Sequence, residues 1–304
     1  MQFPKSIKIN QWDLPANKLK PPKVITFDAY NTLYSTTLPV MEQYCKIGLK
    51  YGIEADPQHL TVKFPKIFKD LRASHPNYGK YTNLTPNEWW ETLISNIFEP
   101  IKVPKEMITE ILKTFEGFGA YTVYPDLLEF LKNMRAAFPG TIFGVVSNTD
   151  PIMHTLIKNI GLAPYFGTHV YLSYDLEVSK PDPKIFEHAL SDIVTKNPEL
   201  LENMSYEELK KRCWHIGDER LNDMSGASNA GWNGVLIDRM NKYKFLGKLS
   251  EENEREEYEL YKDKIDNNSQ ESWKLSLFQT DAMQIDKRQF VISNFNTLSK
   301  MFLS

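Results

Sequence analysis

The sequence predicts an α/β fold: a doubly wound parallel sheet of the Rossmann-like kind, with a helical domain inserted after the first strand. From residue 121 onward, short β-branched apolar runs alternate with amphipathic stretches, as expected for parallel strands joined by helices. Polar residues with reactive side chains follow directly after several of these runs. In a doubly wound sheet, that edge is where ligands bind.

The predicted strands are short and rich in valine, isoleucine and aromatic residues, which favours buried strands. They cover residues 24–27, 141–146, 169–172, 213–216, 234–237 and 290–292. Helices are predicted between them, over residues 126–138, 151–160, 222–230 and 298–303, with another starting near Asp182-Pro183. The order of these elements gives the alternation on which the fold class rests.

The stretch between the first two strands is predicted to be mainly helical. Apolar residues recur at helical spacing from Val40 to Tyr51 and again from Ile108 to Phe115. Thr85, followed by a proline and then a glutamate, indicates a capped helix start. The Gly117-Phe-Gly119 sequence at the end of this stretch lacks the third glycine of a dinucleotide loop, and we interpret it as a hinge.

Composition excludes several classes of function. The chain has 304 residues, a formal charge of −3 and two cysteines without metal-ligand spacing, so we expect no nucleic-acid partner and a reducing, intracellular compartment. No apolar run is long enough to predict a membrane span. Residues 1–23 hold five lysines and only one acid. We therefore predict a cytoplasmic protein, with a mitochondrial location as the alternative.

Two segments are predicted to lie outside the folded units. Residues 1–22 are interpreted as a tail that packs Trp12 and Leu14 on the domain. Residues 251–271 contain nine acids and three basic residues, which favours a solvated excursion. We predict an acidic insertion over residues 246–285, partly disordered, before the last strand resumes.

Four short motifs follow one another along the chain. They are Phe27-Asp28-Ala-Tyr30, Val146-Ser147-Asn148, Ser179-Lys180-Pro-Asp182-Pro183, and Ile216-Gly217-Asp218-x-x-x-Asn222-Asp223. Each acid or hydroxyl alone is most often a helix cap or turn former. In this order and at these separations, the motifs resemble the haloacid dehalogenase-like (HAD) hydrolase superfamily. The resemblance implies a HAD core formed by residues 23–35, 121–245 and 286–304, and a helical cap over residues 36–120.

The resemblance also implies a chemical role for each acid. Asp28 takes the place of the nucleophile, which forms a covalent intermediate with phosphorus or carbon. Direct ligands to Mg²⁺ would be Asp28, the main-chain carbonyl of Tyr30, and Asp218. Asp223 would order the ligating waters or Lys180. Magnesium prefers this set of oxygen donors.

Other positions are implied to bind a phosphorylated small-molecule substrate. Ser147 and Asn148 would donate hydrogen bonds to phosphate oxygens, and Lys180 would neutralise the nucleophile and the transferring group. The catalytic set is then Asp28, Lys180 and Ser147. The Pro-Asn-Tyr-Gly sequence around Asn77 and Tyr78, with the Trp-Trp pair after it, resembles the group of haloacid dehalogenase-like hydrolase domain-containing protein 3. We expect Asn77 and Tyr78 to face the substrate.

Tyr30 departs from the pattern of the superfamily's phosphatases. They carry an aspartate there that protonates the leaving oxygen, and a phenol with a pKa near 10 is a poor substitute. The sequence therefore predicts a magnesium-dependent phosphatase of weak or unusual activity. Alternatives are a 2-haloacid dehalogenase, because halide leaves without a proton, and a non-catalytic phospho-ligand sensor. His215, within an apolar strand, is interpreted as a core residue.

Overall fold

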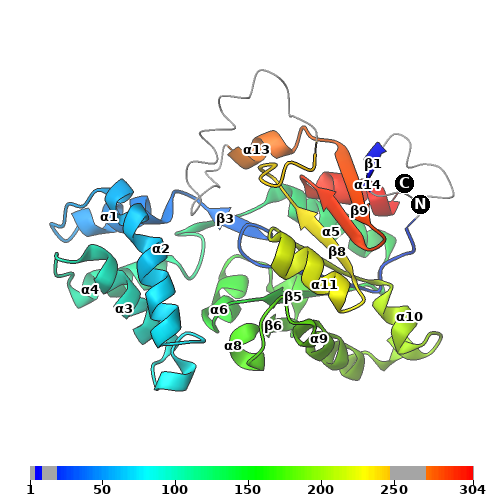
Figure 1. Ribbon diagram of the computed structural model, residues 1–304, viewed down its shortest axis with the longest axis horizontal. Helices are drawn as coiled ribbons and strands as arrows, with labels where there is room; N and C mark the ends of the chain where they lie inside the picture. The colour runs from blue at the N-terminus through cyan, green and yellow to red at the C-terminus, as the bar shows by residue number, and fades with distance from the viewer. Residues whose placement is uncertain (1–3, 9–18, 247–271, 304) are drawn as a thin grey trace.

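The computed structural model describes residues 4–8, 19–246 and 272–303, which form a larger lobe around a sheet and a smaller helical lobe (Figure 1). The larger sheet runs in the order β1-β9-β10-β8-β7-β2-β5-β6. Its strands are β1 (Lys5–Lys8), β9 (Asp281–Asp286), β10 (Gln289–Ile292), β8 (Asn233–Ile237), β7 (Cys213–Gly217), β2 (Val24–Phe27), β5 (Ile142–Ser147) and β6 (Val170–Leu172). From β10 to β6 all neighbours are parallel, so the predicted doubly wound sheet is confirmed.

Helices cover both faces of this sheet. They are α5 (Pro125–Ala137), α6 (Ile152–Asn159), α7 (Ala163–Phe166), α8 (Ser173–Leu176), α9 (Pro183–Lys196), α10 (Tyr206–Lys210), α11 (Gly226–Asn229), α13 (Ser272–Ser276) and α14 (Phe295–Leu303). Short 3₁₀ turns cover Lys80–Thr82 and Pro198–Leu201, and Arg220–Ser225 forms a π-helical turn. None of the helices in the described ranges is both long and apolar enough to cross a membrane.

Side-chain alternation along the strands divides the core between the two faces. On β2, Ile25 and Phe27 pack with α5 and α14, whereas Val24 packs with α9 and α11 on the other face. All three are fully buried. Because β2 is central and covered on both sides, its end is fixed rigidly, and that end carries Asp28.

The helical lobe is inserted between β2 and β5. It contains α1 (Val40–Leu49), α2 (Pro57–Ser74), α3 (Pro86–Phe98) and α4 (Lys105–Thr114), which share a hydrophobic core separate from those of the sheet. The predicted helix N-cap at Thr85 is present. Its side chain accepts a hydrogen bond from the Glu88 N–H, and the Glu88 carboxylate accepts one from the Thr85 N–H. Two antiparallel strands, β3 (Tyr34–Thr36) and β4 (Tyr121–Val123), join this lobe to the sheet.

The edge of the sheet differs from the prediction. The sequence predicts a tail over residues 1–22, but Lys5–Lys8 forms strand β1, which pairs with β9. The sequence also predicts an acidic insertion up to residue 285, but Asp281–Asp286 forms strand β9. Both strands are antiparallel additions whose sequences alone carry no strong strand signal, because edge strands depend on pairing with a neighbour. Trp12, Leu14 and the acidic residues 251–271 lie outside the described residues.

Candidate functional site

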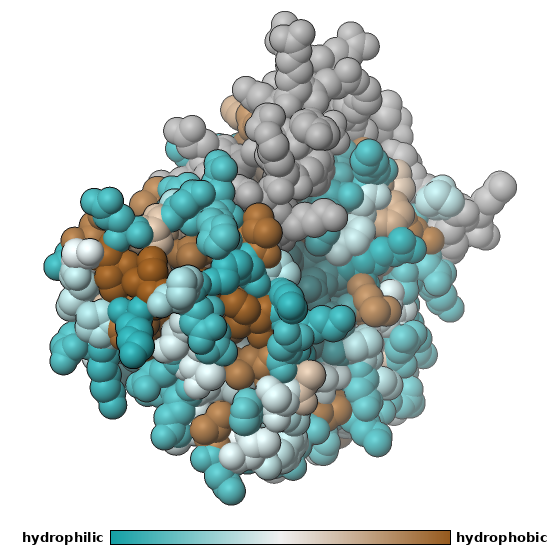
Figure 2. All heavy atoms as spheres, turned by 60° about the vertical axis from the view of Figure 1, so that its left-hand side comes forward, coloured by the Kyte–Doolittle hydropathy of each residue, from teal (hydrophilic) through white to brown (hydrophobic). Residues whose placement is uncertain are grey.

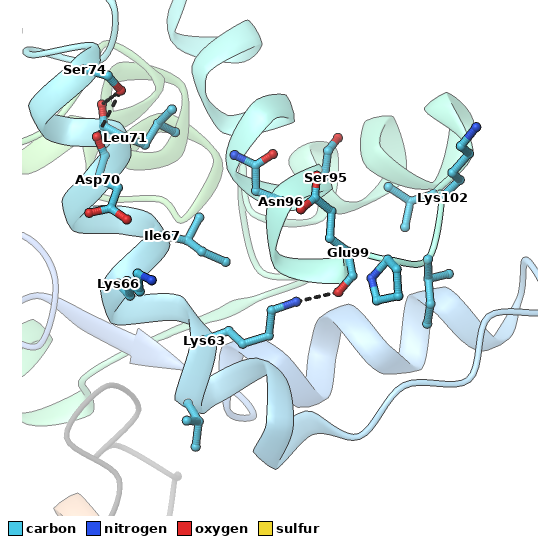
Figure 3. A pocket seen from close by; sticks show the side chains of 14 residues that line it. Lys63, Lys66, Ile67, Asp70, Leu71, Ser74, Ser95, Asn96, Glu99 and Lys102 are labelled. Atoms are coloured by element: carbon cyan, nitrogen blue, oxygen red, sulfur yellow. Dashed lines mark hydrogen bonds between the residues drawn. The ribbon is translucent and has the colours of Figure 1, made fainter.

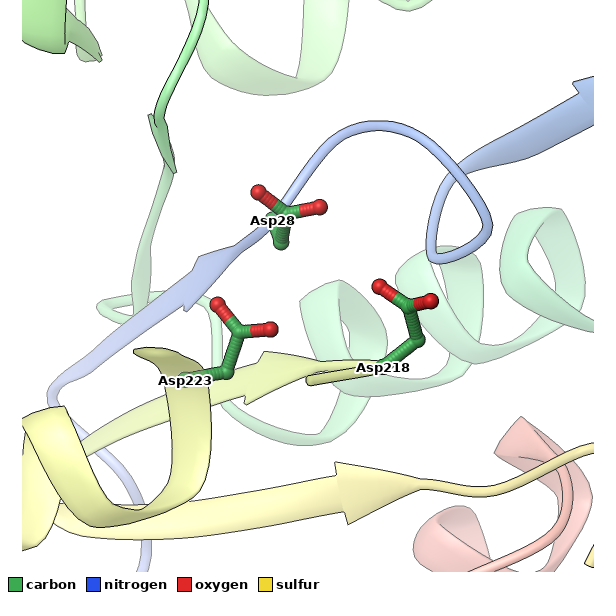
Figure 4. Close-up of side chains that lie close together, drawn as sticks. All are labelled: Asp28, Asp218 and Asp223. Atoms are coloured by element: carbon green, nitrogen blue, oxygen red, sulfur yellow. The ribbon is translucent and has the colours of Figure 1, made fainter. Parts of the chain in front are cut away.

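Three of the predicted site residues meet at one edge of the sheet. Asp28 follows β2, Ser147 ends β5 and Asp218 follows β7, and these strands are neighbours in the order β7-β2-β5. The carboxylates of Asp28, Asp218 and Asp223 offer oxygens that all lie within 4.8 Å of one another (Figure 4). The carboxyl ends of parallel strands meet at one edge, which explains why residues so distant in sequence converge.

Lys180 links two of these acids. Its Nζ donates to Asp28 Oδ1 and to Asp223 Oδ1, each at 2.6 Å. Ser147 Oγ donates to the same Asp28 oxygen at 3.0 Å. The Lys180 side chain is 2% exposed and that of Asp28 is 15% exposed, so the ammonium is held inside while the nucleophile candidate keeps an accessible surface.

Asp223 is held more firmly than the sequence indicates. Besides Lys180, its carboxylate accepts from the backbone N–H of Glu219 at 2.9 Å and lies 3.0 Å from His215 Nε2. Gly217 makes room for it, because a Cβ at that position would lie 2.1 Å from Asp223 Cγ. This close approach is the physical reason for glycine beside Asp218 in the fourth motif.

The charges of this cluster do not balance. Burial and the nearby Asp28 and Asp223 carboxylates raise the pKa of Asp218 well above its ordinary value. Burial also raises the pKa of Asp28, although Lys180 opposes the shift. For Asp223, the charge of Lys180 and the His215 hydrogen bond outweigh burial and lower the pKa. One ammonium thus faces three carboxylates, an arrangement that favours an added cation.

The Asn148 side chain makes two hydrogen bonds with the backbone of Lys180. Its Nδ2 donates to the Lys180 carbonyl at 2.9 Å, and its Oδ1 accepts from the Lys180 N–H at 2.8 Å. These two hydrogen bonds to the backbone of Lys180 hold that residue in place and use one of the two N–H groups of Asn148 Nδ2. The predicted contact of Asn148 with a phosphate oxygen stays a prediction. Sequence could not reveal the contact with Lys180, because the two segments meet only in the folded sheet.

Asn77 and Tyr78 lie where the tip of the helical lobe contacts the sheet lobe. Asn77 Nδ2 donates to the Tyr174 carbonyl at 3.3 Å, and Tyr78 Oη donates to the Asn148 carbonyl at 3.3 Å. Both residues also line a cavity of about 200 Å³ together with Asn148 and Ser179. Their predicted contact with substrate stays a prediction.

The Tyr30 ring packs in an aromatic group at the junction of the two lobes. It lies edge-on to Tyr34 at 6.1 Å and to Tyr121 at 6.5 Å between ring centroids. Those two rings belong to β3 and β4, which lead into and out of the helical lobe. Tyr30 thus stabilises the junction in addition to following the nucleophile candidate by two residues.

A larger hollow lies elsewhere. A groove of about 1390 Å³ runs between α2 and residues 95–103, wholly within the helical lobe (Figure 3). Exposed Val62 and Ile101 lie on it, and apolar side chains gather on this side of the molecule in Figure 2. Lys63 reaches across to donate to the Glu99 carbonyl. None of the predicted site residues lines the groove, so size alone does not mark the site.

Two contributors to the site were not predicted from sequence. Thr26 and His215 occupy register positions opposite each other on β2 and β7, fully buried behind the acids. The sequence predicts His215 as a core residue; it is buried, and it also contacts Asp223. The available signal was a polar pair in two otherwise apolar strands, two residues before Asp28 and three before Asp218.

Comparison with known proteins identifies the family. The family model for haloacid dehalogenase-like hydrolases matches residues 22–231, more than half of the chain. The chain belongs to the haloacid dehalogenase-like hydrolase family. A protein of Saccharomyces cerevisiae named uncharacterized protein YMR130W is 52% identical over 302 residues, covering 99% of this chain and all of that one.

Two further likenesses show how this HAD hydrolase relates to others. Haloacid dehalogenase-like hydrolase domain-containing protein 3 of Danio rerio is 26% identical over 72% of this chain and 86% of its own. The structure of L-2-haloacid dehalogenase from Xanthobacter autotrophicus matches 92% of this chain and 98% of that one, with a TM-score of 0.53 and 15% identity. At that identity the likeness concerns the fold alone.

Replacing Gly217 by alanine is expected to lower stability by ~1–3 kcal/mol, the usual cost of an added methyl group in a packed site. The new Cβ would lie 2.1 Å from Asp223 Cγ, so it would push the Asp223 carboxylate away from Lys180. Thermal unfolding measures the effect. Gly140→Ala is a matched control, since a Cβ at Gly140 meets nothing within 4 Å. Equal melting temperatures for both variants would contradict the close approach at Gly217.

Proposed function

We propose that this HAD hydrolase is a magnesium-dependent phosphohydrolase that acts on a small phosphorylated molecule through an aspartyl-phosphate intermediate. The observation that carries the proposal is the pairing of a buried ammonium, Lys180, with Asp28 at 2.6 Å, beside a second carboxylate, Asp218, that Lys180 does not contact. The Lys180 ammonium can thereby neutralise the nucleophile and the transferring phosphate, while the Asp218 carboxylate stays available to a cation.

The residues present fit a magnesium ion. Asp28 and Asp218 supply hard carboxylate oxygens close together, and the hydrogen bonds that the described residues make to the Asp28 side chain use Oδ1. Asp223 is committed to Lys180 and to a backbone N–H, so we assign it to positioning rather than direct coordination. We propose the Tyr30 carbonyl as a further ligand. Bound Mg²⁺ would reduce the repulsion between the carboxylate and a phosphate dianion.

The chain's own groups define the proposed reaction. An Asp28 carboxylate oxygen attacks phosphorus as the bond from phosphorus to the leaving oxygen breaks, which leaves a phosphorylated Asp28. Ser147 Oγ and Lys180 Nζ donate to the region where negative charge develops. Water then attacks the phosphorus and releases inorganic phosphate and the free carboxylate.

Tyr30 restricts the leaving group in this scheme. A carboxylic acid there would protonate a departing alkoxide, and its absence typically costs about 10²–10⁴-fold in rate. Acyl phosphates and anhydrides depart without that proton. We therefore propose substrates of this kind before ordinary sugar or alcohol monoesters.

One observation favours dehalogenation as a second candidate. Tyr30 stands where the phosphatases of the superfamily carry a proton-donating aspartate. A departing halide needs no proton, so a dehalogenase needs no acid at this position. Against it, the carbon–halogen bond that would react carries no charge for a magnesium ion to neutralise. Burial and the Asp28 and Asp223 carboxylates also disfavour an ionised Asp218 without a cation. A hydrolysis screen with Mg²⁺ that includes acyl phosphates, phosphomonoesters and 2-haloacids separates the two candidates. Turnover of 2-haloacids alone, independent of metal, would replace the phosphatase proposal.

Replacing Asp218 by asparagine should weaken magnesium binding at least about 10-fold. The change removes one charged ligand and preserves the shape of the side chain, so a hard cation loses most of its attraction to that position. Calorimetric titration with MgCl₂ measures the dissociation constant.

An exposed carboxylate on another element offers a control for that experiment. Glu187→Gln removes the same charge on α9, outside the cluster of three carboxylates, and should change the affinity by no more than about twofold. Equal magnesium affinity in wild type and Asp218→Asn would exclude Asp218 as a ligand.

A further inference from the structure

The polar pair behind the acids lies within the sheet. Thr26 and His215 are direct register partners on β2 and β7 and are fully buried. Thr26 Oγ1 lies 2.8 Å from His215 Nδ1, and His215 Nε2 lies 3.0 Å from Asp223 Oδ1. A contact chain therefore leads from a strand interior to Lys180 and on to Asp28.

We propose that Thr26 and His215 are positioning residues of this site: the Thr26 hydroxyl holds His215 in its Nε2–H tautomer, and that proton holds Asp223 in the orientation that clamps Lys180 against Asp28. The role in turnover rests on the proposed phosphohydrolase function, whereas the tautomer does not. The proposal goes beyond the motif residues, which include neither Thr26 nor His215.

The tautomer follows from the acceptors around the ring. Asp223 Oδ1 receives the Lys180 ammonium at 2.6 Å, as expected of an ionised carboxylate. An ionised carboxylate can only accept, so the nitrogen facing it at 3.0 Å must carry a proton. In neutral imidazole the other nitrogen, Nδ1, is then an acceptor. The hydroxyl of Thr26 is the donor within reach of it, at 2.8 Å. The Trp214 carbonyl is a second acceptor for the same O–H, but at the longer distance of 3.4 Å.

The consequence concerns the direction of the Asp223 carboxylate. Asp223 Oδ1 accepts hydrogen bonds from His215 Nε2 and Lys180 Nζ, while Oδ2 accepts one from the Glu219 N–H. With all three donors in place, rotation of the carboxylate would break at least one charge-assisted hydrogen bond. Without the His215 proton, Oδ1 depends on Lys180 alone, and the ammonium can follow Asp223 away from Asp28.

A pair of substitutions at Thr26 separates hydrogen bonding from packing. Thr26→Val keeps the branched shape and removes the hydroxyl, whereas Thr26→Ser keeps the hydroxyl and removes a methyl group. If the pair only fills the core, serine should be the more damaging change. If the hydroxyl sets the tautomer, valine should be the more damaging change.

The first measurement does not depend on activity. In the ¹⁵N-labelled full chain, His215 is assigned by the signal that disappears in His215→Gln, and its two ring nitrogens report the tautomer. We expect Nε2 protonated in wild type and Thr26→Ser, where both ring nitrogens have a partner. In Thr26→Val the buried Nδ1 has no donor, and the cost of that unpaired acceptor opposes the preference of Asp223, so we expect a mixture of tautomers. A His215 protonated at Nδ1 in wild type, or an unchanged tautomer in Thr26→Val, would overturn the proposal.

The second measurement uses acetyl phosphate and Mg²⁺. We expect kcat about tenfold lower in Thr26→Val, the rate equivalent of one hydrogen bond to a charged group, with KM within about twofold and Thr26→Ser close to wild type. Equal kcat in wild type and Thr26→Val would refute the positioning role even if the tautomer shifts. If wild type does not hydrolyse acetyl phosphate or any other phosphate tested, the phosphohydrolase proposal fails, and the tautomer measurement still decides this inference.

Discussion

Replacing Asp28 by asparagine is expected to abolish covalent capture of phosphate and to reduce phosphate turnover by about 10³-fold or more. The amide oxygen is a far poorer nucleophile than a carboxylate oxygen, so no aspartyl adduct can form. Incubation with Mg²⁺ and beryllofluoride, or with acetyl phosphate, followed by mass spectrometry of a peptide spanning residues 24–33, measures the adduct in wild type and variant.

The Asp28→Asn fold should be preserved. The amide oxygen can still accept from Ser147 and Lys180, which bond to Oδ1 in the wild type. Removing this negative charge also relieves its repulsion with Asp218, which contributes to the raised pKa of that acid. Asp70→Asn, an exposed carboxylate on α2, provides a control that should behave as wild type. Turnover surviving in Asp28→Asn would place the chemistry elsewhere.

Replacing Tyr30 by aspartate should raise hydrolysis of an unactivated phosphomonoester by about 10²-fold, the lower end of general acid–base catalysis. The new carboxyl group follows the nucleophile by two residues and can protonate the leaving oxygen. Acetyl phosphate should gain much less, because its leaving group departs without a proton. Initial rates on both substrates, measured at saturating Mg²⁺, give the ratio.

Tyr30→Asn is the matched control for the lost ring. Both variants remove the contacts with Tyr34 and Tyr121 at the junction with the helical lobe, so any loss of stability should be shared. Only the aspartate variant gains an acid. Similar rates for the two variants on the monoester would show that proton donation does not limit this site. Loss of 2-haloacid turnover from an active wild type would instead favour the dehalogenase.

Much of this fold is encoded locally. The strands of the parallel sheet are short apolar runs with β-branched residues, which bury well on both faces whatever their neighbours are. Asp28, Ser147 and Asp218 each follow such a run, and parallel strands place these ends together. Their convergence could therefore be predicted from sequence order. The strand pair β1 and β9 could not, since an edge strand forms only against its partner.

The fold class, the family resemblance and the positions of the acids could be read from the amino-acid sequence, because these depend on short-range patterns and on their order. The contacts that each side chain makes became visible in the folded molecule. Asn148 pairs with the backbone N–H and C=O of Lys180, and His215 is both a buried core residue and a partner of Asp223. The first contact joins segments 32 residues apart, and the second joins β7 to the π-helical turn eight residues further on. They depend on distances of a few ångströms and on the direction of single hydrogen bonds, which no local pattern specifies.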